Sequence, residues 1–211
     1  MIVKPRSDRD SHQDALERAW GTVSALDFAT LAKDLSTGGD GADGVVRLSL
    51  LGDPIVADVR AKTVKYDRPD GADVSRYLQV LVLHYLAGVG RSQLTERLIS
   101  FREFEGGAMY YPAFKARAIT PLVREFGYKP ELLRRVATAM GGEPLSVGSV
   151  GFRFAFFEKL PVSVVLWLGD IEVSASANIL FDASAARILS TEDVTVVGGV
   201  LSRTLIKNAR K

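Results

Sequence analysis

The stretch VGFRFAFFEKLPVSVVLWL, residues 150–168, decides the fold class. In its first half phenylalanine recurs at every second position from Phe152 to Phe156, the period of a strand with one buried face. Leu160-Pro161 ends this run. Residues 162–168 are then almost continuously apolar, which is typical of a central strand covered on both faces. The stretch therefore predicts two successive strands, one half-buried and one fully buried.

Shorter strand-like runs lie on both sides of this stretch. The further predicted strands are Val46–Leu50, Ile55–Val59, Thr63–Tyr66, Ser100–Phe104 and Ala177–Phe181. Gly52-Asp53-Pro54 has the composition of a turn and predicts that the first two of these form a hairpin. Gly169-Asp170 is a second turn signal, directly after the fully buried strand. The strands are thus expected to be short and mostly antiparallel.

Helical periodicity fills most of the remaining sequence. The predicted helices are residues 7–35 with a break at Gly21-Thr22, then Val74–Ala87, Tyr111–Phe126, Pro130–Met140 and Ser190–Ile206. The second of these is the most apolar and is predicted as the central helix of the core. Pro121 predicts a kink because proline has no N–H for the helical ladder. Ser190, followed by acidic residues, has the pattern of an N-cap.

Strand pairs separated by a helical middle favour an α+β fold over regular βαβ winding. We expect one globular domain over residues 1–211, with its strands packed against the central apolar helix and a C-terminal helix. Its N-terminal helices cover residues 7–35, and the glycine-rich segment 38–44 is predicted as a connector. A chain of this length buries roughly 70% of its unfolded surface, so it needs no covalent staples.

Composition excludes several classes of site. The chain has no cysteine, which rules out disulfides, thiolate zinc sites and cysteine nucleophiles within it. No apolar run reaches the ~20 residues of a membrane span, and the polar first ten residues show no signal peptide. We therefore expect a cytoplasmic protein without a membrane partner. The net charge of +2 is too small to indicate a polyanionic ligand.

Several motifs occur in an order that resembles a known family. They are SFREFEGG (100–107), Tyr110-Tyr111, Leu160-Pro161-Val162, LWLGD (166–170), ILFDASA (179–185) and TEDV (191–194). The chain resembles the prokaryotic domain-of-unknown-function family numbered 3786 from near Leu26 to the C-terminal helix. That family has no established activity, so the resemblance implies neither catalytic residues nor a cofactor. Some relatives carry a cysteine-rich segment of iron–sulfur type ahead of this domain, a role that a cysteine-free chain cannot inherit.

The segment from Ser100 to Tyr111 is the first candidate binding site. Its candidate ligand-binding residues are Arg102, Glu103, Gly106, Gly107, Tyr110 and Tyr111. Tyrosine hydroxyls beside an arginine can orient an anionic or carbonyl group, and glycines let a ligand approach the backbone closely. The alternative is structural: a strand with phenylalanines in the core, ending in a turn whose glycines need positive φ.

Other chemistry-bearing residues give weaker signals. Carboxylates that meet in space can bind Mg²⁺ or Ca²⁺, or divide acid and base roles. The candidates are Glu158, Asp170, Glu172, Asp182, Glu192 and Asp193. Each also fits a turn or a helix cap, so no metal site is predicted. His84 is interpreted as a hydrogen-bonded core histidine, with a general base as the alternative. Gly88-Val89-Gly90 lacks the third glycine and the preceding strand of a dinucleotide loop.

These observations leave three hypotheses for function. The first is a binding or accessory module for a small molecule or a partner protein. The second is an enzyme that uses carboxylate, tyrosine and arginine side chains, with or without a divalent metal. The third is a self-associating interaction module. Nucleic-acid binding is disfavoured because the aromatic strand from Phe152 to Phe156 lacks the second such strand of an RNA-recognition module. Catalytic residues, cofactor and oligomeric state stay unassigned.

Overall fold

The computed structural model describes residues 8–28, 31, 35 and 44–211. The chain divides into two compact units, the second made of Ser49–Gly52 and Ser92–Lys211 and the first of the rest. Helices and antiparallel strands together confirm the α+β class. A single domain over residues 1–211 stays a prediction, and residues 38–43 of the expected connector lie outside the described residues.

The first unit combines two described helices with a three-stranded sheet. Its elements are α1 (Asp8–Ser24), β1 (Val45–Leu50), whose last two residues count with the second unit, β2 (Asp53–Asp58), β3 (Thr63–Tyr66) and α3 (Arg76–Gly88). The strand order is β1-β2-β3, and α3 contacts α1. The turn between the first two strands lies at Leu51-Gly52, where φ is 51° and 87°, the left-handed pair of a two-residue hairpin. The predicted turn at residues 52–54 was therefore placed too late, because β2 already begins at Asp53.

The predicted break at Gly21-Thr22 is wrong, because α1 runs without interruption to Ser24. A glycine inside a helix costs only about 1 kcal/mol relative to alanine. Trp20 and Val23, on either side of it, are both buried. Burial of an apolar side chain contributes about 1.5–3 kcal/mol, so the flanking residues outweigh the glycine.

The second unit is built on a five-stranded antiparallel sheet. Its strands, in spatial order, are β4 (Leu98–Ser100), β8 (Ser176–Asp182), β7 (Leu160–Trp167), β6 (Val150–Phe157) and β5 (Glu143–Leu145). The central strand β7 is buried at every position except Trp167, which confirms the prediction from its apolar run. Leu160-Pro161 does not break the strand as expected. Instead, the register of β6 shifts between Ala155 and Phe157, and Pro161 pairs with Ala155.

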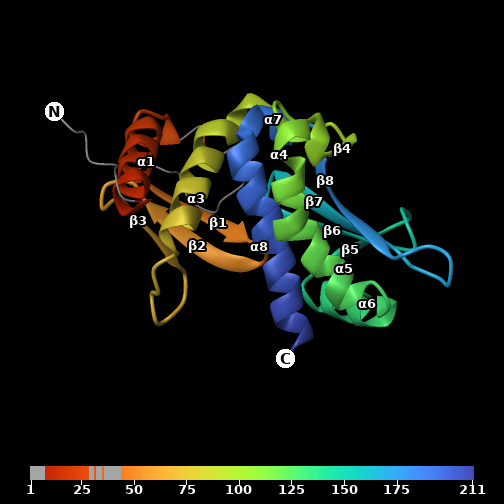
Figure 1. Ribbon diagram of the computed structural model, residues 1–211. Coiled ribbons are helices and arrows are strands. Elements are labelled where there is room, and N and C mark those ends of the chain that lie inside the picture. The colour runs from red at the N-terminus through yellow and green to blue at the C-terminus, as the bar shows by residue number, and fades with distance from the viewer. Residues whose placement is uncertain (1–7, 29–30, 32–34, 36–43) are drawn as a thin grey trace. The chain divides into compact units, whose positions relative to one another are not determined.

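Helices of the second unit cover one face of this sheet, with α4, α5 and α8 in front of the strands in Figure 1. They are α4 (Gly107–Phe114), η3 (Lys115–Ile119), α5 (Thr120–Phe126), α6 (Pro130–Ala139), α7 (Ala185–Ile188) and α8 (Thr191–Ala209). The turn η3 is a π-helix, and it precedes Pro121. Because proline cannot donate to the ladder, an interruption at this place is what Pro121 predicts.

The C-terminal helix α8 begins as its sequence predicts. Ser190 Oγ accepts a hydrogen bond from the N–H of Asp193 at 3.2 Å, and the Asp193 carboxylate accepts from the N–H of Ser190 at 3.2 Å. This reciprocal cap satisfies two N–H groups that the helix itself leaves free. Further along, a Cβ at Gly198 would lie 2.5 Å from the ring of Phe114. The glycine inside α8 is therefore explained by the close packing of Phe114 from α4.

None of the helices in the described part of the chain combines the length and the apolar character needed to cross a membrane.

Candidate functional site

The segment Ser100–Phe104 is not the strand that the sequence predicts. The strand β4 ends at Ser100, and residues 101–103 form the 3₁₀ turn η2. The N–H of Ser100 donates to Glu103 Oε1 at 2.7 Å, which closes the turn. Phe101 stacks on Phe114 with ring centroids 4.0 Å apart, and Phe104 meets Phe181 edge-on at 5.4 Å. The two phenylalanines are core residues, as the structural alternative proposed, but a turn presents them.

Both glycines of this segment have a structural requirement. Gly106 has φ 69° and forms the N-cap of α4 in the left-handed region, which favours glycine. A Cβ at Gly107 would overlap the carbonyl oxygen of Phe101. This close approach lets α4 begin at Gly107, four residues before the predicted start at Tyr111. The absence of a side chain at these positions therefore allows the backbone of η2 and the backbone of α4 to approach each other closely. Binding of a ligand by these glycines stays a prediction.

The remaining candidate residues lie in η2 and α4, where Arg102 and Tyr110 are exposed and Tyr111 is half-buried. The guanidinium of Arg102 lies over the ring of Tyr111, 3.9 Å from its centroid. Tyr110 and its neighbour Met109 are 59% and 74% exposed. Glu103 is occupied by its hydrogen bond to Ser100 and by Arg97 at 3.8 Å. Arg102, Met109, Tyr110 and Tyr111 are named the α4 face below.

The six acidic candidates do not converge. Glu158 lies in the β6–β7 turn, Asp170 and Glu172 in the β7–β8 connection, and Glu192 and Asp193 in the first turn of α8. Among the described residues there is no group of three or more histidine, aspartate or glutamate side chains that could hold a metal ion. The expectation that each of these acids fits a turn or a helix cap is supported for Asp170 and Asp193, whose carboxylates accept hydrogen bonds from backbone N–H groups.

Asp182 is the most strongly perturbed of these acids. Its buried carboxylate accepts hydrogen bonds from the N–H and Oγ1 of Thr95 at 3.0 and 2.9 Å, and from the N–H of Ser184 at 2.9 Å. Burial alone would raise its pKa, but the hydrogen bonds from Ser184 and Thr95 lower the pKa of Asp182 to about 2. The carboxylate thus holds residues 95 and 184 to the end of β8.

Glu158 has the opposite perturbation. Its Oε1 accepts a hydrogen bond of 2.5 Å from the N–H of Ser49, and the neighbouring N–H of Leu51 donates to the carbonyl of Phe156. Burial raises the pKa of Glu158, and the backbone hydrogen bonds from its own N–H and from Ser49 only partly oppose this. The ionised form is therefore the less favourable form of this side chain in the folded protein.

We accordingly expect Glu158→Gln to raise the melting temperature at pH 7. A group whose folded pKa is raised contributes stability below its unfolded pKa and loses it as the pH rises through the folded pKa. Glutamine keeps an oxygen for Ser49 without the buried charge. Thermal unfolding at pH 4 and pH 7 checks this, with the exposed Glu143→Gln as the matched control. A Glu158→Gln variant that is less stable at pH 7 would contradict it.

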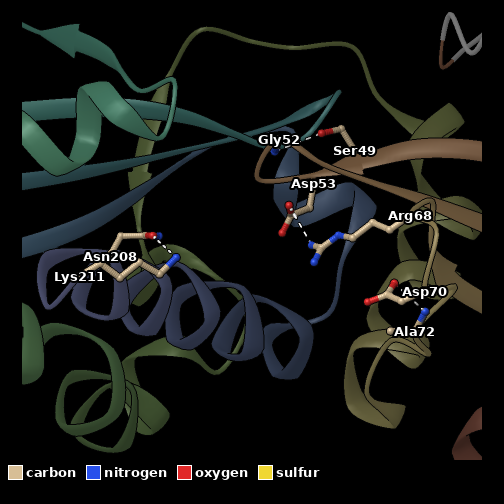
Figure 2. A network of polar contacts seen from close by, with 8 residues as sticks. All are labelled: Ser49, Gly52, Asp53, Arg68, Asp70, Ala72, Asn208 and Lys211. Atoms are coloured by element: carbon tan, nitrogen blue, oxygen red, sulfur yellow. Dashed lines mark hydrogen bonds and ion pairs between the residues drawn. The ribbon is translucent and has the colours of Figure 1, made fainter.

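The first unit carries a second arginine–tyrosine stack that the sequence did not single out. Arg68 lies 4.4 Å from the ring centroid of Tyr66 and forms an ion pair with Asp53 at 3.0 Å (Figure 2). Burial and the charge of Asp53 raise the pKa of Tyr66, while Arg68 opposes the shift. Both ends of the ion pair are more than 40% exposed, so the pair contributes little to stability.

The sequence analysis also did not predict that several large apolar side chains near the β7–β8 connection are exposed. They are Tyr128, Val147, Trp167, Leu168, Ile171 and Val173, named the hairpin patch below. Apolar residues inside the turn-like run from Gly169 to Ser174 are the only signal that points to it.

Comparison with known proteins gives one match. The model of a family described as a domain of unknown function (DUF3786) matches residues 27–204. No curated protein matches the chain. No solved structure matches it either.

Proposed function

The chain belongs to the DUF3786 family, a family of unknown function, and we propose that it is a non-catalytic binding module that docks a partner protein on the α4 face. The observation that carries this proposal is the exposure of Met109 and Tyr110 on α4, next in sequence to Tyr111, on whose ring Arg102 stacks. Methionine, tyrosine and arginine are the residue types enriched at protein interfaces, and tyrosine and arginine dominate binding energy there.

The geometry of Arg102 favours an acidic group on the partner. Stacking on Tyr111 engages the flat face of the guanidinium, which leaves its N–H donors in the plane of the group. Such donors match a carboxylate in a bidentate arrangement. Lys115 and Arg117, which are exposed just beyond α4, add positive charge nearby. We therefore infer a partner segment that presents one or more carboxylates next to apolar side chains.

The α4 face is held rigid from beneath. The turn η2 is closed by Glu103, and Phe101 and Phe104 anchor it in the aromatic core. On the other side, Thr191 Oγ1 donates to the carbonyl of Glu105 at 2.7 Å. Interfaces that are ordered before binding lose less conformational entropy when the partner arrives. This preorganisation supports a binding role for the exposed side chains.

We prefer a protein partner to a small molecule because small ligands are held in concave sites that bury most of their surface. Met109 and Tyr110 instead project from the exposed side of a helix. The enzyme hypothesis has less support. Glu103, the carboxylate next to Arg102, is held by Ser100 and Arg97, and the six other acidic candidates lie at separate turns, caps and a strand end.

The proposal is tested with a photo-crosslinking amino acid at position 109, introduced in the native cells, and with the same group at exposed Tyr77 as control. We expect a discrete cross-linked partner from position 109 alone. Arg102→Ala should reduce its yield about tenfold, as loss of a 1–2 kcal/mol contact implies. The melting temperature should hardly move, because Arg102 is exposed. Equal cross-linking from both positions, or unfolding by Arg102→Ala, would show that the α4 face is structural.

A further inference from the structure

The connection between β7 and β8 presents apolar side chains to solvent in an unusual concentration. Ile171 is fully exposed and Val173 is 62% exposed, while Trp167 and Leu168 at the strand end are each about 40% exposed. In Figure 1 this connection extends beyond α6, at the end of the five-stranded sheet. Core packing within the second unit does not explain side chains at these positions.

This connection is a preformed turn. The carboxylate of Asp170 accepts hydrogen bonds from the N–H groups of Glu172 and Val173 at 2.8 and 2.7 Å. Its own N–H donates to the carbonyl of Val173 at 2.8 Å. These backbone hydrogen bonds lower the pKa of Asp170, so it stays ionised at neutral pH. Ile171 is therefore held outward by a turn that is already ordered, which keeps the entropic cost of binding low.

The turn packs against neighbouring elements that also expose apolar side chains. A Cβ at Gly127 would lie 2.9 Å from the Cβ of Ala175, so the base of the turn abuts the α5–α6 connection, where Tyr128 is 72% exposed. The N–H of Leu168 donates to Ser149 Oγ at 3.2 Å, which places the β5–β6 turn and Val147 alongside. Monomers rarely expose apolar patches above a few hundred Å², and larger patches mark interaction sites.

Charge on the two sides of the hairpin patch has opposite sign. The turn carries the carboxylates of Asp170 and Glu172, and both residues are exposed. The α5–α6 connection carries Lys129, which directly follows Tyr128 and is exposed. Arg134 lies close by, bonded to the carbonyl of Ser149 at 3.2 Å, but it also forms an ion pair with Glu131 at 3.3 Å, so the positive charge on this side rests on Lys129. A surface that is acidic on one side, apolar in the middle and basic on the other complements a copy of itself rotated by 180°.

We propose that the hairpin patch binds a second copy of this chain in a two-fold symmetric dimer, with the acidic turn of each copy facing Lys129 of the other. Ile171 and Tyr128 supply the apolar centre of this contact. We infer a second copy as the occupant because the patch carries charges of both signs, and the same patch on another copy offers the opposite charge to each. An anionic membrane surface is disfavoured, since Asp170 and Glu172 flank the apolar tip and would be repelled by it. The dimer uses a surface other than the α4 face and does not depend on the binding role proposed for that face.

Sedimentation equilibrium over a range of concentrations tests the dimer. The wild-type chain should approach twice its monomer mass of 22.9 kDa as its concentration rises. Ile171→Lys should raise the dissociation constant at least tenfold without unfolding, because the side chain contacts solvent only. Met109→Lys is the matched control: it should abolish partner binding on the α4 face but leave the dimer intact, so the two proposals fail separately.

A charge exchange tests the orientation of the two copies. Glu172→Lys and Lys129→Glu should each weaken the dimer, and the chain that carries both substitutions should recover it, because the opposite charges again face each other. A wild-type monomer at every concentration would overturn the proposal. A dimer whose dissociation constant is unchanged by Ile171→Lys would also overturn it. So would a monomer that cosediments with vesicles of phosphatidylglycerol and phosphatidylcholine and loses this binding in the Ile171→Lys variant.

Discussion

Gly107→Ala is expected to remove about 3 kcal/mol or more from the free energy of unfolding of the second unit. A Cβ at this position would overlap the carbonyl oxygen of Phe101, which is backbone and cannot rotate away as a side chain would. The turn η2 would have to move, and with it the stack of Phe101 on Phe114 and the contact of Phe104 with Phe181. Forcing atoms into a close-packed core typically costs 1–3 kcal/mol, and displaced backbone costs more.

Two other glycines provide matched controls for this prediction. Gly106→Ala places a Cβ 3.8 Å from the Tyr110 ring, an ordinary contact, so its cost is only the 1–2 kcal/mol of a left-handed φ. A Cβ at Gly21, in the last turn of α1, would have no atom within 4 Å. Gly21→Ala should therefore stabilise the helix by roughly 0.5–1 kcal/mol.

Urea unfolding of the three glycine variants, followed by circular dichroism, gives the comparison. The expected order of stability is Gly21→Ala, wild type, Gly106→Ala and Gly107→Ala. If Gly107→Ala were no less stable than Gly106→Ala, the contact with the carbonyl of Phe101 would not be what requires glycine at position 107. A binding role would then be the remaining reason for Gly107, whereas Gly106 would keep its requirement for positive φ.

Strands β6 and β7 of the second unit were predictable because their signal is local, whereas the three-residue strands β4 and β5 were not predicted. The alternation in β6 and the continuous apolar run in β7 follow directly from how many faces of each strand are buried. The cap of α8 was predictable for the same reason, since Ser190 and Asp193 satisfy each other within one turn. The position of Pro121 likewise predicted the interruption of the helix at η3.

Features that depend on distant contacts were not predictable. The run Ser100–Phe104 has the composition of a strand, but Glu103 closes it into a turn whose phenylalanines stack on residues from α4 and β8. From sequence alone, Gly198 only lowers the helix propensity of α8, and the close packing of the Phe114 ring that requires a glycine there is visible only in the structure. In both cases tertiary packing overrides local propensity.

The candidate site shows the same division. The sequence singled out Arg102 and Tyr111, and the guanidinium does lie over the ring, but residue types alone do not reveal which side chains are exposed. Met109 and Ile171 are apolar, and the sequence does not show that both lie at the surface. An exposed apolar side chain can be recognised as a candidate binding residue only when the folded structure shows that no other part of the chain covers it.

Asp182→Asn is expected to cost about 2 kcal/mol of stability at pH 7. The buried carboxylate accepts hydrogen bonds from Thr95 and from the N–H of Ser184, and asparagine would turn an NH₂ group toward some of these donors. A pKa of about 2, against an ordinary value of 3.8, corresponds to roughly this free energy, because each unit is worth 1.36 kcal/mol. Thr95→Ala removes one donor of the set and should cost about half as much.

The pH dependence separates the charge of Asp182 from its shape. Its folded pKa is depressed, so the stabilisation is complete above the unfolded pKa and is lost as the pH falls from about 5 toward 2. Wild type and Asp182→Asn should therefore differ at pH 7 and converge near pH 2, whereas exposed Asp67→Asn should match wild type throughout. Urea unfolding at each pH measures this. An unchanged difference at low pH would mean that packing, rather than the ionised carboxylate, holds Thr95 and Ser184 at the end of β8, because only the charge is lost on protonation.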